Sequence, residues 1–160
     1  MHIRLDYSKA APGSVQAMYK LQKYVDESGL EHSLLELVKT RVSQINGCAF
    51  CIDMHTKDAR AAGETEQRLY GLSAWREAPY YTERERAALA WAEVVTLISQ
   101  THATDEEYEA ARAQFSEEEL VKLTMAVIAI NGWNRLSIAF RPEVGKYQPP
   151  AKAASSSRKT

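Results

Sequence analysis

The stretch from Glu36 to Gly63 constrains the fold most, because it combines a helix break with the chain's only two cysteines. The Asn46-Gly47 pair within it is a turn and breaker signal. It predicts two helices, over about residues 33–45 and 47–62, that fold back on each other. The first of them has an apolar face that would pack on the second, formed by Leu34, Val38, Val42 and Ile45.

The two cysteines form a C-x-x-C motif, Cys48 and Cys51, and His55 follows four residues later. If Asn46 caps the second helix, both thiols lie in its first two turns. At about 100° per residue, the three side chains then fall within about 60° of arc on one helix face. A helix N-terminus favours thiolate over thiol, and an adjacent imidazole can exchange a proton with it. The motif therefore predicts a reactive dithiol rather than two small buried hydrophobic residues.

Glu36 can join this site only if the chain turns. On one continuous helix, twelve residues at about 1.5 Å each would leave it roughly 18 Å from Cys48. A hairpin of two helices would instead bring it toward the thiols. Ser33-x-x-Glu36 is also a capping box, in which a first-turn carboxylate is stabilised by the helix dipole. The residues alone favour neither role for Glu36.

A Glu twelve residues before C-x-x-C-x-x-x-H, with R-V-S-Q-I-N-G-C in between, resembles the AhpD-like alkylhydroperoxidases of the carboxymuconolactone decarboxylase superfamily. The resemblance is specific over about residues 34–63. With the N-G-W-N-R-L-S-I-A-F segment near the end, it covers about residues 10–145. It implies an all-α, AhpD-like helical fold of about six to seven helices in a single domain.

The resemblance also implies roles for four residues. Cys51 would attack the substrate, Cys48 would resolve the intermediate, and His55 and Glu36 would relay protons. The spacing agrees, since Cys51 is one turn from His55, while Cys48 is expected to be better exposed for exchange with a reductant. One residue departs from the pattern: Phe50 stands where the AhpD proteins have a second histidine. Phenylalanine cannot relay protons, so either the relay is shorter here or the activity differs.

The expected function is a thiol-dependent peroxidase that reduces hydroperoxides. The dithiol supplies both electrons, so no metal, flavin or haem cofactor is expected. An external dithiol must regenerate it. In the resembling family this is a lipoyl-bearing protein, and a thioredoxin-like donor is the generic alternative. The family also implies a homo-oligomer, a trimer or hexamer.

Two other functions are consistent with the same residues. Cys48, Cys51 and His55 are plausible zinc ligands with Glu36 as a fourth, although no second Cys/His pair exists. A redox-sensing or stress-response protein would use the disulfide as a switch without turnover. A lactone decarboxylase is less consistent, because C-x-x-C belongs to the peroxidase-like branch. The absence of a β-α-β pattern disfavours a thioredoxin fold.

The remaining sequence bounds the organisation of the chain. Its 160 residues amount to one domain, predicted over residues 1–145, with a tail over 146–160. A formal charge of −1 gives no indication of nucleic-acid or membrane-surface binding. The N-terminus lacks a secretion signal, and two cysteines are too few for a disulfide scaffold, so a cytoplasmic location is expected.

Local signals define further elements. Thr82 with Glu85 and Ser116 with Glu119 form capping boxes that should open two helices. The second of these is apolar nearly all round over residues 120–130, which predicts burial on more than one side. Charged residues interrupt it, so it is not expected to span a membrane. Residues 1–12 are expected to form an extended arm, and two acidic residues of the dithiol helix are expected to be solvent-facing or first-turn charges: Asp53 and Asp58.

Overall fold

The computed structural model describes residues 2–150, and all regular structure within that range is helical. The helices in chain order are α1 (Tyr7–Ala10), α2 (Pro12–Asp26), α3 (His32–Asn46), α4 (Ala49–Ala62), α5 (Glu66–Tyr70), the 3₁₀ helix η1 (Gly71–Ala74), α6 (Glu83–Thr96), α7 (Ile98–Thr101), α8 (Asp105–Arg112) and α9 (Glu117–Phe140). The all-α prediction is confirmed. The predicted number of six to seven helices is too low for this part of the chain, which holds nine α-helices. Helices α1 and α7 have only four residues each, too few to show an apolar period.

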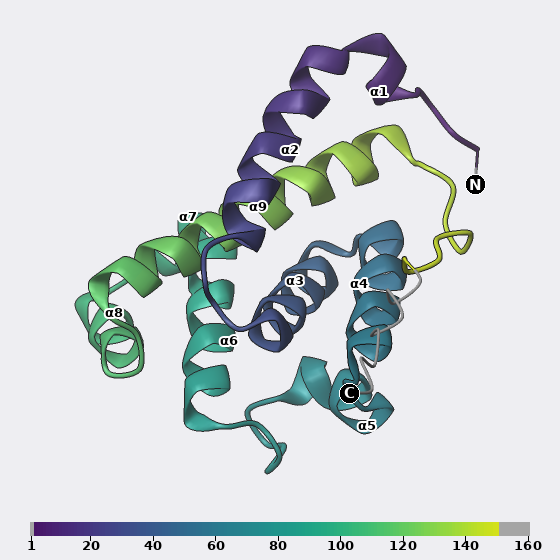
Figure 1. Cartoon of the computed structure of the whole chain (residues 1–160). Helices are drawn as coiled ribbons and strands as arrows, with labels where there is room; N and C mark the ends of the chain where they lie inside the picture. The colour runs from purple at the N-terminus through teal and green to yellow at the C-terminus, as the bar shows by residue number, and fades with distance from the viewer. Residues whose placement is uncertain (1, 151–160) are drawn as a thin grey trace, which may run out of the picture.

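Helix α3 lies at the centre of the single compact domain, in contact with α4, α6 and α9 (Figure 1). Most of its apolar side chains belong to the main core, whereas Leu37 belongs to a second, smaller core beside η1 and α6. Polar side chains of α3 are buried too, and these are Glu36, Lys39, Thr40 and Ser43. A helix enclosed on most sides cannot solvate its polar groups, so they need partners inside the protein. This arrangement places charged groups next to the dithiol helix.

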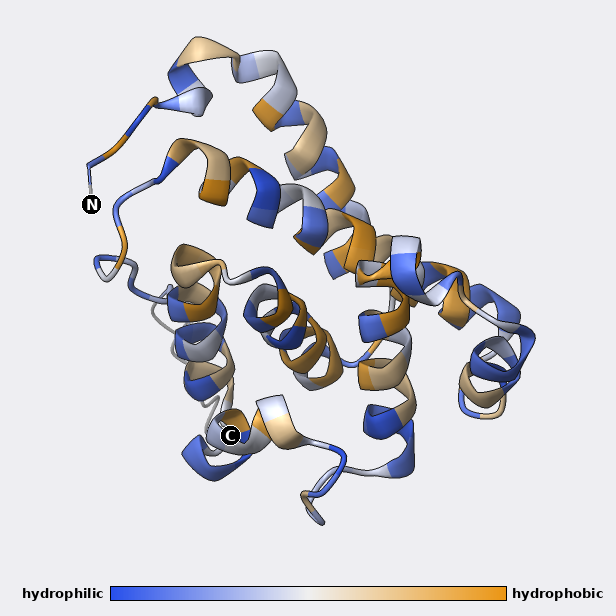
Figure 2. Cartoon of the chain, turned by 180° about the vertical axis from the view of Figure 1, so that it is seen from behind, coloured by the Kyte–Doolittle hydropathy of each residue, from blue (hydrophilic) through white to orange (hydrophobic). Residues whose placement is uncertain are grey.

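Hydropathy follows this arrangement (Figure 2). The ribbon of the central α3 carries many hydrophobic residues with hydrophilic ones between them, whereas the outlying α8 is mostly hydrophilic. Helix α9 packs against α2 as well as against α3 and α6, and buries Leu123 and Val127, but Val121 is 60% exposed and Ile128 is 46% exposed. The predicted burial of α9 on more than one side is therefore confirmed in part, since some of its apolar surface stays exposed in the single chain.

Local signals gave correct helix starts at α6 and α9. Both predicted capping boxes are present, at Thr82 with Glu85 and at Ser116 with Glu119. The extended arm predicted for residues 1–12 is wrong in part, because Asp6 accepts hydrogen bonds from Ser8 N and Lys9 N and caps α1.

The last described residues do not leave the domain surface. Residues 146–150 have no helix, and Tyr147 contacts α4. The rest of the predicted tail lies outside the described residues, so the domain boundary at 145 stays a prediction. In the part of the chain that the structure describes, no helix has the length and apolar character needed to cross a membrane.

Candidate active site at the α3–α4 hairpin

The turn between α3 and α4 sets the position of both cysteines. Gly47 ends α3 in the left-handed conformation at φ 70°, which glycine adopts without steric cost. Cys48 is then the N-cap of α4, and its Sγ accepts a hydrogen bond from Cys51 N at 3.4 Å. The prediction that Asn46 caps the second helix is wrong. The Asn46 amide instead donates to Asn131 and Asn134 of α9, at 3.0 and 2.8 Å.

Cys48 and Cys51 are joined as a disulfide, with their Cα atoms 5.4 Å apart. Each residue is only 1% exposed, so the prediction that Cys48 is better exposed is wrong for the single chain. The two sulfurs still differ in surroundings. A cavity of about 690 Å³ is lined by Cys48 but not by Cys51, and its walls include Phe50 and Ile138. Open space therefore adjoins the Cys48 side of the disulfide.

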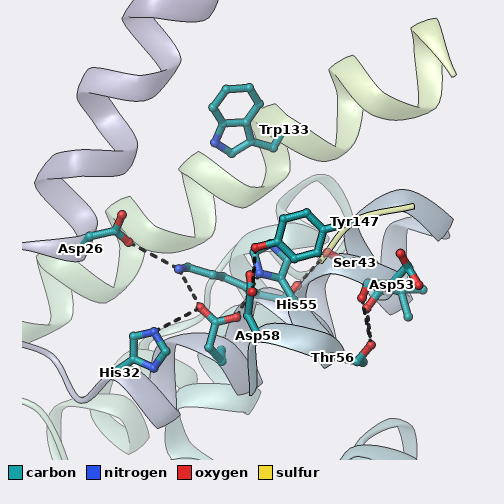
Figure 3. A network of polar contacts seen from close by, with 12 residues as sticks. Asp26, His32, Ser43, Asp53, His55, Thr56, Asp58, Trp133 and Tyr147 are labelled. Carbon is teal, nitrogen blue, oxygen red and sulfur yellow. Dashed lines mark hydrogen bonds and ion pairs between the residues drawn. The ribbon is translucent and has the colours of Figure 1, made fainter. Parts of the chain in front are cut away.

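Glu36 and His55 form a buried pair across the hairpin. His55 Nδ1 lies 3.0 Å from Glu36 Oε2, and both side chains are more than nine-tenths buried. The other oxygen, Oε1, accepts from Lys39 Nζ at 3.0 Å, and Asp26 Oδ1 lies 3.5 Å from the same ammonium (Figure 3). Burial by itself raises the pKa of the Glu36 carboxyl, but the hydrogen bond with His55 and the charge of Lys39 outweigh it and hold that pKa at about 2. Glu36 is therefore ionised at neutral pH.

The capping-box explanation of Glu36 is wrong. Helix α3 begins at His32, and its N-cap, Glu31, makes no side-chain capping bond. Glu36 consequently lies beyond the first turn, where its carboxylate points into the hairpin and not back to the helix start. The hairpin brings it to His55, as the fold-back of the two helices predicted.

His55 lies one turn after Cys51 on α4, as the spacing predicts. Its hydrogen bond to Glu36 uses Nδ1 and leaves Nε2 available to another group. Within residues 2–150, no hydrogen bond joins His55 to either sulfur of the disulfide. A direct exchange of a proton between the imidazole and Cys51 therefore belongs to the reduced form, in which a thiol exists.

Two further side chains complete the cluster. Asp58 Oδ1 accepts a hydrogen bond from Tyr147 Oη at 2.7 Å. One ligand atom each from Glu36, His55 and Asp58 lies within 4.8 Å of the others. The prediction that Asp58 faces solvent holds only in part, because the C-terminal segment, residues 145–147, partly covers it. A signal existed for Asp58, which is three residues after His55 on the same helix face. None existed for Tyr147.

The charged cluster does not match the predicted zinc site. That site needs the thiolates of Cys48 and Cys51, and here the two sulfurs are bonded to each other. The group whose ligand atoms converge is Glu36, His55 and Asp58. The Lys39 ammonium, 3.0 Å from Glu36, already supplies positive charge where a cation would bind.

Comparisons with known proteins agree with this site. The profile of the Carboxymuconolactone decarboxylase family matches residues 12–94. The chain is 48% identical over 139 residues to YdfG, an uncharacterized protein of Bacillus subtilis, covering 87% of this chain and 95% of that one. The chain belongs to the carboxymuconolactone decarboxylase family. This family member is also 28% identical to YnjA, an uncharacterized protein of Escherichia coli, over 71% of this chain and 59% of YnjA.

Solved structures place the chain in the AhpD-like group of this family. A protein of unknown function from Agrobacterium tumefaciens, suggested to be the antioxidant defence protein AhpD, matches with a TM-score of 0.88 and 49% identity over 90% of this chain and 99% of that one. The debrominase Bmp8 shares the fold, with a TM-score of 0.74 and 20% identity over 86% of this chain and 74% of Bmp8. At that identity the likeness concerns the fold alone.

Proposed function

We propose that this carboxymuconolactone decarboxylase family member is a thiol-dependent peroxidase that reduces hydroperoxides through Cys48 and Cys51. The observation that carries the proposal is the disulfide at the start of α4 with the buried His55–Glu36 pair one turn behind it. The resemblance to the Agrobacterium tumefaciens protein supports a peroxidase-related role at the level of the family.

In the reduced enzyme, His55 takes the proton of the Cys51 thiol, and Glu36 stabilises the resulting imidazolium. The thiolate attacks the terminal peroxide oxygen, the O–O bond breaks, and Cys51 becomes a sulfenic acid. His55 returns the proton to the departing alkoxide, which leaves as an alcohol. Cys48 then forms the S–S bond with Cys51, and the sulfenic oxygen leaves as water. The two electrons come from the dithiol, so these steps need no cofactor.

The oxidised form must be reduced by an external dithiol, and the cavity beside Cys48 supports an entry point for it. Thiol–disulfide exchange requires an in-line approach to one sulfur, and open space adjoins Cys48. A lipoyl arm is an aliphatic chain ending in a dithiol, and apolar walls such as Phe50 and Ile138 would suit it. A thioredoxin-like protein is the alternative reductant. Such reductants operate in the cytoplasm, where we place the enzyme.

We also propose that the enzyme is a homo-oligomer, a trimer or hexamer. The exposed apolar side chains on α9, Val121 and Ile128, support this, because they would be covered by a neighbouring subunit. Light scattering should give a mass of at least three times 18.0 kDa. A monomer would contradict the oligomer without affecting the dithiol chemistry.

The test is stopped-flow mixing of the reduced protein with an organic hydroperoxide, followed by thiol quantification. The parent should lose two thiols per peroxide. Cys51→Ser should abolish the reaction, because the attacking sulfur is gone. Cys48→Ser should still react once but stop at a sulfenic acid, detectable by dimedone labelling. A Cys51→Ser variant that reacts as fast as the parent would refute the proposal.

The phenylalanine at position 50 supports a second candidate function, that of a redox sensor. This side chain lines the cavity where the family pattern has a proton-relaying histidine. Steady-state turnover with a lipoyl donor separates the two functions, since a sensor reacts once and stops whereas an enzyme continues. Elemental analysis of the purified protein checks the zinc-binding alternative.

A further inference from the structure

The chemistry proposed above uses Glu36 and His55 but leaves Asp58 and Tyr147 without a role. Both belong to the same cluster (Figure 3). They come from positions 89 residues apart, Asp58 on α4 and Tyr147 beyond the end of α9. The C-terminal segment therefore closes over the proposed proton relay, and its contacts define what it does there.

The C-terminal segment is fastened to α4 through its main chain as well as its side chain. Lys57 Nζ donates to the carbonyl oxygens of Tyr147 at 3.0 Å and Gly145 at 3.4 Å. Asp53 holds the same ammonium at 2.9 Å. Two hydrogen bonds from Lys57 and one to Asp58 thus fix where the Tyr147 ring lies. These backbone contacts hold the phenol of Tyr147 within hydrogen-bond distance of Asp58.

The charges of the cluster explain why a phenol is needed. Glu36 and Asp58 are two carboxylates whose oxygens lie within 4.8 Å, in largely buried surroundings. Like charges at that distance repel, and the Lys39 ammonium contacts Glu36 and Asp26 but, among the described contacts, not Asp58. Asp58 instead accepts a hydrogen bond from the Tyr147 hydroxyl. That hydrogen bond satisfies the second carboxylate, one oxygen of which lies within 4.8 Å of a ring nitrogen of His55.

Tyr147 remains a donor at working pH. Burial and the hydrogen bond to Asp58 raise the pKa of its phenol to about 12. A neutral phenol donates one hydrogen bond and adds no negative charge to the cluster. A second carboxylate next to an imidazole stabilises the imidazolium that forms when His55 takes the thiol proton.

We infer that Tyr147 is a positioning residue that holds Asp58 against the Glu36–His55 pair, and that Asp58 is the second carboxylate supporting His55 as the base for Cys51. The inference rests on the proposed function, because His55 acts there as the base. It assigns residues 145–147 to the active site. Asp58 would then give the proton relay a further polar group, although position 50 holds a phenylalanine in place of the family's histidine.

The experiment measures the thiol without using peroxide. Reduced protein is treated with iodoacetamide at pH 7, and the rate of labelling at Cys51 is followed by mass spectrometry of the peptide. Asp58→Asn should slow labelling about tenfold, and Tyr147→Phe should slow it about fivefold. The double variant should be no slower than Asp58→Asn, because the phenol acts through that carboxylate. Asp58→Glu should recover part of the rate.

The controls separate a positioning role from a structural one. Tyr147→Phe keeps the aromatic ring and removes only the hydroxyl, so its melting temperature should stay close to that of the parent. Tyr70→Phe removes a hydroxyl from a side chain that is 76% exposed, and should label at the parent rate. Labelling of Tyr147→Phe and Asp58→Asn within twofold of the parent would overturn the inference.

The labelling experiment tests the positioning role independently of the peroxidase proposal. If the parent does not reduce hydroperoxides but Asp58→Asn and Tyr147→Phe still slow Cys51 labelling, the peroxidase proposal fails and the positioning role holds. If the parent reduces hydroperoxides and neither variant changes the labelling rate, the positioning role fails and the peroxidase proposal holds.

Discussion

Replacing Glu36 by glutamine tests how strongly the buried ion cluster stabilises the fold. The carboxyl has an ordinary pKa of 4.5 and a pKa of about 2 in the folded protein. At 1.36 kcal/mol per pH unit, that difference corresponds to about 3 kcal/mol of stability. Because the folded-state pKa is depressed, this stability is fully present above about pH 5 and is lost as the pH falls toward 2.

The magnitude at an accessible pH follows from the same two values. At pH 3.5 the unfolded carboxyl is mostly protonated while the folded one is still ionised, so about 1.4 kcal/mol of the contribution is lost relative to pH 6. Glu36→Gln has no such titration. It also leaves the Lys39 ammonium with only Asp26, 3.5 Å away, which should lower stability by about 3 kcal/mol at neutral pH.

The assay is urea denaturation of both proteins at pH 6.0 and pH 3.5, followed by circular dichroism. The gap in unfolding free energy between parent and Glu36→Gln should be about 1.4 kcal/mol smaller at the lower pH. Other carboxylates titrate in both proteins and cancel. Glu118→Gln, on a side chain that is 78% exposed, is the matched control and should change stability by no more than about 0.5 kcal/mol at either pH. A gap that is equal at both pH values would refute the reasoning.

Three further predictions concern the hairpin. Gly47→Ala should destabilise the protein by about 1 kcal/mol in urea denaturation, because φ is +70° there and the added methyl meets no atom within 4 Å that could help or hinder it. Thr40→Val should raise the unfolding free energy by about 1 kcal/mol, because the buried Thr40 Oγ1 has no hydrogen-bond partner among the described residues; a loss of stability would show that the hydroxyl is satisfied. Phe50→His should raise steady-state hydroperoxide turnover with a dithiol donor, and an unchanged rate would mean that position 50 does not limit the relay.

The sequence by itself determined the local features of this protein. The capping boxes at Thr82 and Ser116, the break at Gly47, and the alignment of Cys48, Cys51 and His55 on one helix depend on a few neighbouring residues. Helix caps, left-handed glycine and side-chain spacing are short-range properties, so they can be predicted without knowing how helices pack. The family resemblance extended this to the all-α fold, which the structure confirms.

Tertiary packing decided what surrounds those local features. The helix break at Gly47 predicted that α3 and α4 pack on each other. The details of that packing made Glu36 Oε2 the partner of His55 and buried Lys39 beside Glu36. The path of the chain after α9 brought Tyr147 to Asp58, a contact between residues 89 positions apart. Such contacts depend on the position of whole helices, and no spacing within a short segment encodes them. The same packing left both cysteines buried and placed the cavity of about 690 Å³ against Cys48 and not against Cys51.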